Sequence, residues 1–132
     1  MPIIPDGFQT ITPYFFCDEP LAFATFLEQA FDGVETGRTQ REDGTIANMM
    51  VRVGTVTLMI SQADKNYPAM QTALYIYVDN ADESMARALA AGAALEMDVM
   101  DMSYGDRQGG VRDTAGNIWW ISQRLTDQPY RD

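Results

Sequence analysis

The chain has 132 residues, enough for one domain with a sizeable core, and 46% of them are hydrophobic. Nineteen acidic residues against nine basic ones give a formal net charge of −10, which disfavours nucleic acid and anionic membrane surfaces as partners. The same charge favours solubility and allows attraction of a cationic ligand. No apolar run approaches the roughly 18–20 residues that span a bilayer.

The single cysteine and the N-terminal segment both bear on location. Cys17 cannot form a disulfide within the chain, and the first residues lack the basic start and long apolar stretch of a signal peptide. We therefore expect a cytoplasmic protein.

The first half of the chain predicts a strand, a helix and three further strands. Residues 9–17 are rich in Thr, Ile, Tyr and Phe, which is typical of a strand. Asp18-Glu19-Pro20 predicts a helix start with an acidic N-cap, and Gly33 predicts its end. The apolar face of this helix is predicted at Phe23, Phe26, Leu27 and Ala30. Asp43-Gly44 and Gly54 then separate strands at 37–43, 45–53 and 55–61.

The second half repeats this order after a loop-like segment at 62–70. A strand at 72–79 leads into a helix that Asn80 and Glu83 begin as a capping box. The positions that complete this helix are Met85, Ala88, Leu89 and Gly92. Three strands follow, at 95–100, 108–113 and 117–124. We therefore predict the α+β class, with one domain (1–132) built from two βαβββ modules at 8–62 and 71–124.

Strand alternation assigns one face of each sheet to its helix and the other to a shared cup. The side chains predicted under the helices are Phe15, Cys17, Ala47, Met49, Val51, Val53, Leu74, Ile76, Val78, Trp119 and Ile121. Those predicted on the cup faces are Thr12, Tyr14, Phe16, Ile46, Asn48, Met50, Arg52, Ala73, Tyr75, Tyr77, Ile118, Trp120 and Ser122. A β-bulge would invert such an assignment.

Several segments together resemble one known family. They are residues 11–18, the hairpin at 44–61, Tyr104-Gly-Asp-Arg107 and Gly116-Asn-Ile-Trp119. These segments resemble the glyoxalase/bleomycin-resistance/dioxygenase (vicinal oxygen chelate) superfamily, and within it the PhnB-like branch. The resemblance covers nearly the whole chain and implies two βαβββ modules that form a curved mixed sheet with a central cup. It also implies a homodimer. One departure is Asp113-Thr-Ala-Gly116, where the family usually has proline after the aspartate.

The metal site that this resemblance implies lacks its ligands here. Metal-dependent members use His and Glu from four cup positions, which correspond by resemblance to Thr12, Asn48, Ala73 and Trp120. Threonine and asparagine are weak neutral oxygen donors, alanine has no donor, and tryptophan offers only an N–H. The chain contains no histidine at all. Because transition metals take imidazole, carboxylate or thiolate, we expect neither a metal nor another cofactor.

Other catalytic arrangements are poorly supported. Ser-His-Asp and Cys-His arrangements need a histidine, so Cys17 is predicted to be a buried strand residue. Lys65, the single lysine, lies in the loop-like segment, and no phosphate-binding Gly-x-x-x-x-Gly-Lys loop is present. A carboxylate acting as general base, such as Asp106, stays open. The sequence leans towards a protein that is not an enzyme without deciding the matter.

The predicted cup instead has the composition of a small-molecule site. Such sites are mostly apolar and aromatic with a few placed polar groups. The candidate ligand-binding residues are Tyr14, Phe16, Asn48, Met50, Arg52, Tyr75, Tyr77 and Trp120. Aromatic rings stack on flat ligands or hold cations, and Arg52 or Arg112 could pair a carboxylate. Alternatively, these side chains fill the cup or a dimer interface.

Three functions therefore remain open. The favoured one is a metal-free binding protein that sequesters an antibiotic or another aromatic or cationic compound, as the resemblance to bleomycin-resistance proteins implies. The second is a divergent lyase or dioxygenase with non-standard metal ligation, and the third is a structural or regulatory domain without a ligand. Whether one chain or two complete each cup also stays open.

Overall fold

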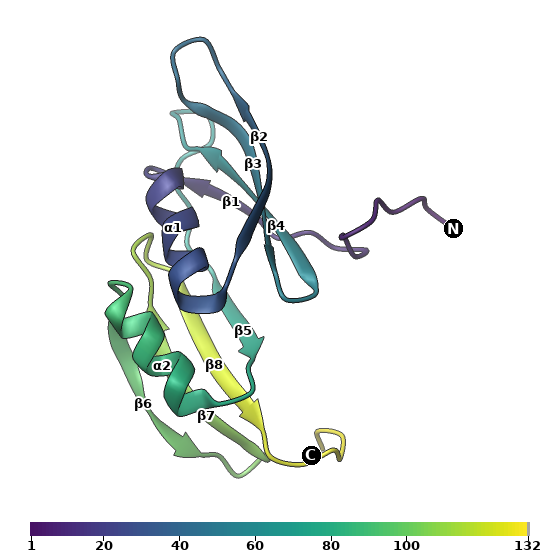
Figure 1. Cartoon of the computed structure of the whole chain (residues 1–132), viewed down its shortest axis with the longest axis vertical. Coiled ribbons are helices and arrows are strands. Elements are labelled where there is room, and N and C mark those ends of the chain that lie inside the picture. The colour runs from purple at the N-terminus through teal and green to yellow at the C-terminus, as the bar shows by residue number, and fades with distance from the viewer. Residues whose placement is uncertain (132) are drawn as a thin grey trace. The chain divides into compact units, whose positions relative to one another are not determined.

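The computed structural model describes residues 1–131, and their contacts divide the chain into two compact units. The first unit comprises Met1–Met70, and the second begins at Gln71. Each unit contains one helix and four strands in the order βαβββ (Figure 1), which confirms the predicted α+β class and the two-module order. A cup shared by the two modules, the single domain 1–132, and the module bounds 8–62 and 71–124 stay predictions.

The first unit is a four-stranded sheet with one helix on it (Figure 1). Its elements are β1 (Tyr14–Cys17), α1 (Pro20–Phe31), β2 (Val34–Gln40), β3 (Ile46–Val53) and β4 (Val56–Gln62). The strand order is β1-β4-β3-β2, with β1 parallel to β4 and the other neighbours antiparallel. Helix α1 buries the four predicted side chains, and the Phe23 ring lies 5.0 Å from that of Phe15 in β1. This packing forms the core of the unit.

Both ends of α1 differ in detail from the prediction. Proline begins the helix as expected, but the N-cap, Glu19, makes no side-chain capping bond. At the other end Asp32 adopts the left-handed conformation (φ 58°), so the helix ends at Phe31, two residues before Gly33. Aspartate tolerates that conformation better than most residues, which is why a glycine is not required there.

A β-bulge in β3 corrects the predicted faces of that strand. Met49 and Val51 are buried as predicted, but Ile46, assigned to the cup, is only 2% exposed, and Ala47 is half-buried. Thr39 of β2 pairs with Asn48, whereas the next residue, Gln40, pairs with Ile46. Ala47 is therefore the extra residue of a bulge, which turns the preceding side chain towards the helix. Val53, at the strand end, is also only half-buried.

The second unit has the same plan (Figure 1). Its elements are β5 (Ala73–Tyr77), α2 (Ala81–Ala90), β6 (Ala94–Asp101), β7 (Asp106–Arg112) and β8 (Ile118–Arg124). The order is β5-β8-β7-β6, with β5 parallel to β8. The predicted cap is present, because the Asn80 side chain accepts the Glu83 backbone N–H at 3.0 Å. Met85 is buried against Gly109, where a Cβ would lie 2.8 Å from the Met85 sulfur, so glycine allows α2 its close approach.

Burial in β8 follows the predicted alternation at Trp119 and Ile121, and a small side chain on the opposite face is buried as well. Trp119 and Ile121 are buried on the helix side, 3% and 0% exposed. Ser122, predicted for the cup, is also fully buried. It pairs with Tyr77 on one side and Gln108 on the other, and by alternation it shares the sheet face of Trp120, opposite the helix, as predicted.

Side-chain hydrogen bonds hold the turn that lacks the usual proline. The Asp113 carboxylate accepts the backbone N–H groups of Ala115 and Asn117 and, at 2.7 Å, the indole N–H of Trp119. The fold is therefore kept despite the departure at this turn. Of the helices in residues 1–131, neither is long and apolar enough to cross a membrane.

Candidate functional site

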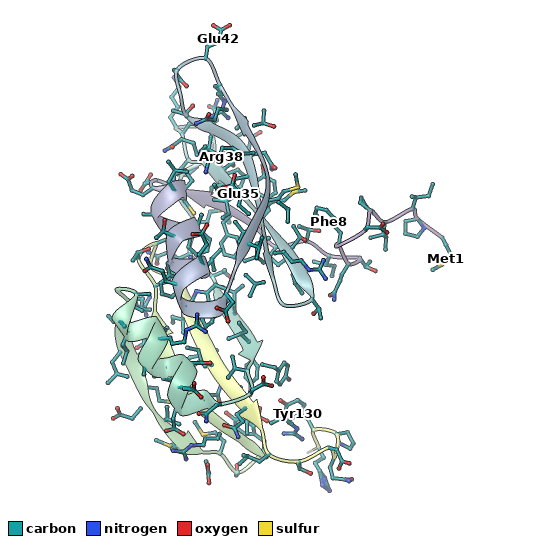
Figure 2. All side chains as sticks on the ribbon, in the orientation of Figure 1. Met1, Phe8, Glu35, Arg38, Glu42 and Tyr130 are labelled. Atoms are coloured by element: carbon teal, nitrogen blue, oxygen red, sulfur yellow. The ribbon has the colours of Figure 1, made fainter. Side chains whose placement is uncertain are left out.

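Four tyrosines of the second unit line a pocket of about 390 Å³. Tyr75 and Tyr77 alternate along β5, and Tyr104 lies in the turn between β6 and β7. Tyr130 lies in the segment after β8, where Figure 2 labels it. Their exposed fractions run from 42% to 57%, so every ring is accessible. By strand alternation, Tyr75 and Tyr77 lie on the sheet face opposite α2.

A buried carboxylate organises this pocket. Asp106, the first residue of β7, is fully buried. Its Oδ2 accepts hydrogen bonds from the hydroxyls of Tyr75 and Tyr130, the latter at 2.7 Å. Its Oδ1 accepts a bond from Arg124 Nη1 at 2.8 Å, and the two residues are cross-strand partners in β7 and β8. One carboxylate thus joins three strands and the C-terminal segment.

Arg124 also hydrogen-bonds the turn before β7 and the segment after β8. Besides Asp106, it donates to the backbone carbonyls of Tyr104 and Gln128, each at 2.7 Å. Its guanidinium carbon also lies 4.0 Å from the centroid of the Tyr130 ring, a cation–π contact. The segment after β8 is therefore held against the pocket by polar bonds as well as by ring contact.

The ionisation states follow from these partners. Burial alone would raise the pKa of Asp106, but the hydrogen bonds from Tyr75, Arg124 and Tyr130 more than offset it, and the net pKa is lowered. Burial raises the pKa of Tyr75 and of Tyr130, and the hydrogen bonds to Asp106 add to both shifts. At neutral pH the Asp106 carboxyl is therefore ionised, and the phenols of Tyr75 and Tyr130 are neutral. A carboxylate with a lowered pKa and both oxygens occupied is a poor general base.

The structure brings only part of the predicted ligand-binding set to this pocket. Of that set, Tyr75 and Tyr77 line it. Trp120 is half-buried on the same sheet face, against Gly110. The others belong to the first unit and are Tyr14, Phe16, Asn48, Met50 and Arg52.

Two groups of the first-unit residues make contacts of their own. The Asn48 amide donates to the Tyr14 hydroxyl at 3.5 Å, and the Tyr14 and Phe16 ring centroids lie 5.2 Å apart. Exposed Arg52 donates to the carbonyl of Gly54 at 3.1 Å. The role of all these residues in binding stays a prediction.

Several pocket residues were not identified from the sequence. Tyr104 lies in the quoted Tyr-Gly-Asp-Arg segment, whose match to the family was the available signal. Tyr130 carried none, because no strand alternation extends to a residue after the last strand, whereas Arg124 ends the last strand, where alternation from Ser122 could have placed it on the same face. Arg112, considered as a ligand partner, instead pairs with Glu96 at 2.6 Å.

The family's metal does not fit the residues present. Thr12, Asn48, Ala73 and Trp120 offer no imidazole, carboxylate or thiolate. Across the described part of the chain, residues 1–131, no three or more His, Cys, Asp or Glu side chains gather as a metal site would require. No step of a mechanism is therefore assigned to a metal.

Comparison with known proteins agrees with this fold. An uncharacterised Mycobacterium bovis protein is 27% identical over 128 residues, covering 89% of this chain and 84% of that protein. TioX from Micromonospora sp. ML1 has a similar structure, with a TM-score of 0.75 and 24% identity. The match covers 89% of this chain and 99% of TioX. A PhnB protein from Bacillus cereus has a TM-score of 0.68 and 17% identity, covering 87% of this chain and 99% of that protein. Residues 10–121 match the family model, so the chain belongs to the Glyoxalase/Bleomycin resistance protein/Dioxygenase superfamily.

Proposed function

We propose that the protein binds a small organic molecule in the tyrosine-lined pocket without the help of a metal. The observation that carries this proposal is the pocket itself, about 390 Å³ and lined by four accessible tyrosine rings. Small-molecule sites commonly have this size and this aromatic character. The buried Asp106–Arg124 pair supports the proposal, because it holds the rings in place before a ligand arrives.

Two features favour binding over catalysis. The four positions that hold a metal in metal-dependent relatives have no suitable donors here. In addition, the pKa of Asp106, the carboxylate nearest the pocket rings, is lowered rather than raised towards neutrality. Both features argue against a divergent lyase or dioxygenase. A purely structural domain is disfavoured because its aromatic face would be filled, whereas these rings are about half exposed.

The proposal includes three finer points. The half-buried Trp120 would add contacts to a larger ligand, and a ligand-binding role for the aromatic and polar residues predicted in the first unit is a separate part of the proposal. The likeness to the Bacillus cereus PhnB protein supports a place in the PhnB-like branch. The superfamily resemblance also supports a homodimer, whose mass light scattering would measure, and the single cysteine supports a cytoplasmic location.

The test is a ligand screen on metal-free protein. Protein treated with a chelator is screened against small aromatic compounds by tryptophan and tyrosine fluorescence, and its metal content is measured by elemental analysis. Hits are then titrated against Tyr77→Ala and against Tyr67→Ala, which removes an exposed tyrosine of the first unit.

The expected result is binding without metal, weakened about tenfold by Tyr77→Ala and little changed by Tyr67→Ala. A stoichiometric transition metal that is needed for binding would overturn the proposal and return the protein to the enzyme class. Absence of any hit that depends on Tyr77 would favour a domain without a ligand.

A further inference from the structure

The hydroxyl protons in the pocket are committed to protein acceptors. Tyr75 and Tyr130 both donate to Asp106, which as an ionised carboxylate can only accept. A phenol carries a single proton, so Tyr130 has none left for Tyr77. In the 2.8 Å contact between those two hydroxyls, Tyr77 must therefore be the donor. Tyr77 therefore donates to Tyr130, and Tyr130 donates to Asp106. Neither hydroxyl proton points towards a ligand.

Tyr104 and Arg124, the other donors described around the pocket, also bond protein acceptors. The Tyr104 hydroxyl donates to the side-chain oxygen of Gln108. Arg124 donates to Asp106, to the Tyr104 carbonyl and to the Gln128 carbonyl. A ligand carboxylate, sulfonate or phosphate would therefore lose its hydration without gaining a hydroxyl donor from any of the four tyrosines, which costs free energy.

What the pocket does offer is the faces of its rings. The accessible lining is mainly apolar, and tyrosines supply it. The face of an aromatic ring is negative, so it attracts a cation within about 6 Å of its centre. Arg124 already uses this attraction, since its guanidinium lies 4.0 Å from the centroid of the Tyr130 ring.

The charge balance points the same way. Asp106 is neutralised by Arg124 at 2.8 Å, so this pair adds no net charge to the pocket. The chain as a whole carries a formal charge of −10, which raises the concentration of cations near its surface.

From these observations we propose that the four tyrosines form an aromatic cage for an organic cation of the quaternary or fully N-methylated ammonium class. Such a cation has no N–H groups, so it loses no hydrogen bonds to an apolar lining, whereas a primary ammonium would leave donors unsatisfied. This inference rests on the proposed function and specifies its ligand class.

The test uses three probes of similar shape that differ in charge. They are meta-hydroxyphenyl-trimethylammonium, the neutral meta-tert-butylphenol and the anionic meta-hydroxybenzenesulfonate. Each is titrated by calorimetry into the full chain. Two variants separate ring face from apolar volume, because Tyr77→Leu removes the aromatic ring and Tyr77→Phe keeps it. Circular dichroism checks that each variant folds, and Tyr67→Leu serves as the control outside the pocket.

The cation should bind at least about tenfold more tightly than the neutral probe, and the anion should bind more weakly than either. Tyr77→Leu should remove most of this preference, while Tyr77→Phe should keep it. If the neutral probe or the anion binds as well as the cation and depends on Tyr77, the ammonium inference fails and the proposed function stands. If no probe binds, the ammonium inference fails. If the compound screen also yields no Tyr77-dependent ligand, the proposed function fails with it.

Discussion

Replacing Asp106 by alanine tests whether one buried carboxylate organises the pocket. The substitution removes the acceptor of three hydrogen bonds, from Tyr75, Tyr130 and Arg124, and leaves the arginine without its counter-charge. Removing one partner of a fully buried ion pair costs about 3–5 kcal/mol. Here the Arg124 side chain is 21% exposed and both phenols reach solvent, so water replaces part of the loss. We expect the free energy of unfolding to fall by about 2–4 kcal/mol.

The assay is urea denaturation followed by tryptophan fluorescence. Both tryptophans, Trp119 and Trp120, lie in the second unit, so the signal reports the unit that contains Asp106. The matched control is Asp82→Ala, which also removes an aspartate that bonds an arginine, Arg107. The Asp82 side chain is 59% exposed, so its removal should cost much less. If Asp106→Ala proves no more damaging than Asp82→Ala, the carboxylate does not organise the site.

Three further outcomes follow from the same geometry. The pKa of Asp106 is lowered from its ordinary value of 3.8, so its charge stabilises the folded state above pH 3.8, and this stability is lost as the pH falls through the lower folded-state pKa. In urea denaturation, the difference in unfolding free energy between wild type and Asp106→Asn should therefore shrink below about pH 4. Gly110→Ala should destabilise the protein by about 1–3 kcal/mol in thermal unfolding and shift tryptophan emission, because the new Cβ would lie 2.5 Å from Trp120 Cζ3. An unchanged emission spectrum would contradict this prediction. Trp120→Ala should abolish binding of a larger ligand in calorimetry while the circular dichroism spectrum is kept, since the ring is only half-buried; global unfolding would refute that placement.

Local patterns in the sequence predicted much of the fold. The apolar spacing in 23–30 and the Asn80 cap correctly located both helices, because helix periodicity and capping depend on residues a few positions apart. Alternation in β8 correctly placed Trp119 and Ile121 under the helix. It failed at Ile46, because the bulge at Ala47 arises from pairing with β2, a neighbour that alternation within one strand does not include.

The candidate site was predicted only in part, for a related reason. Tyr75 and Tyr77 were identified because they alternate along one strand. Asp106, which the sequence left open as an example of a general base, proves to be a hydrogen-bond acceptor with a lowered pKa. Neither its partners nor the state of its protons can be derived from neighbouring residues.

The sequence by itself determined the repeated βαβββ order, the superfamily resemblance and the absence of ligands at the usual metal positions, because each depends on residue type and local spacing. Only the tertiary structure decided which polar groups meet. Strand pairing brings Asp106 opposite Arg124, and the chain after β8 returns Tyr130 to β5, where its hydroxyl meets that of Tyr77. Such contacts join residues distant in sequence, so they are set by the packing of the whole unit rather than by any local pattern.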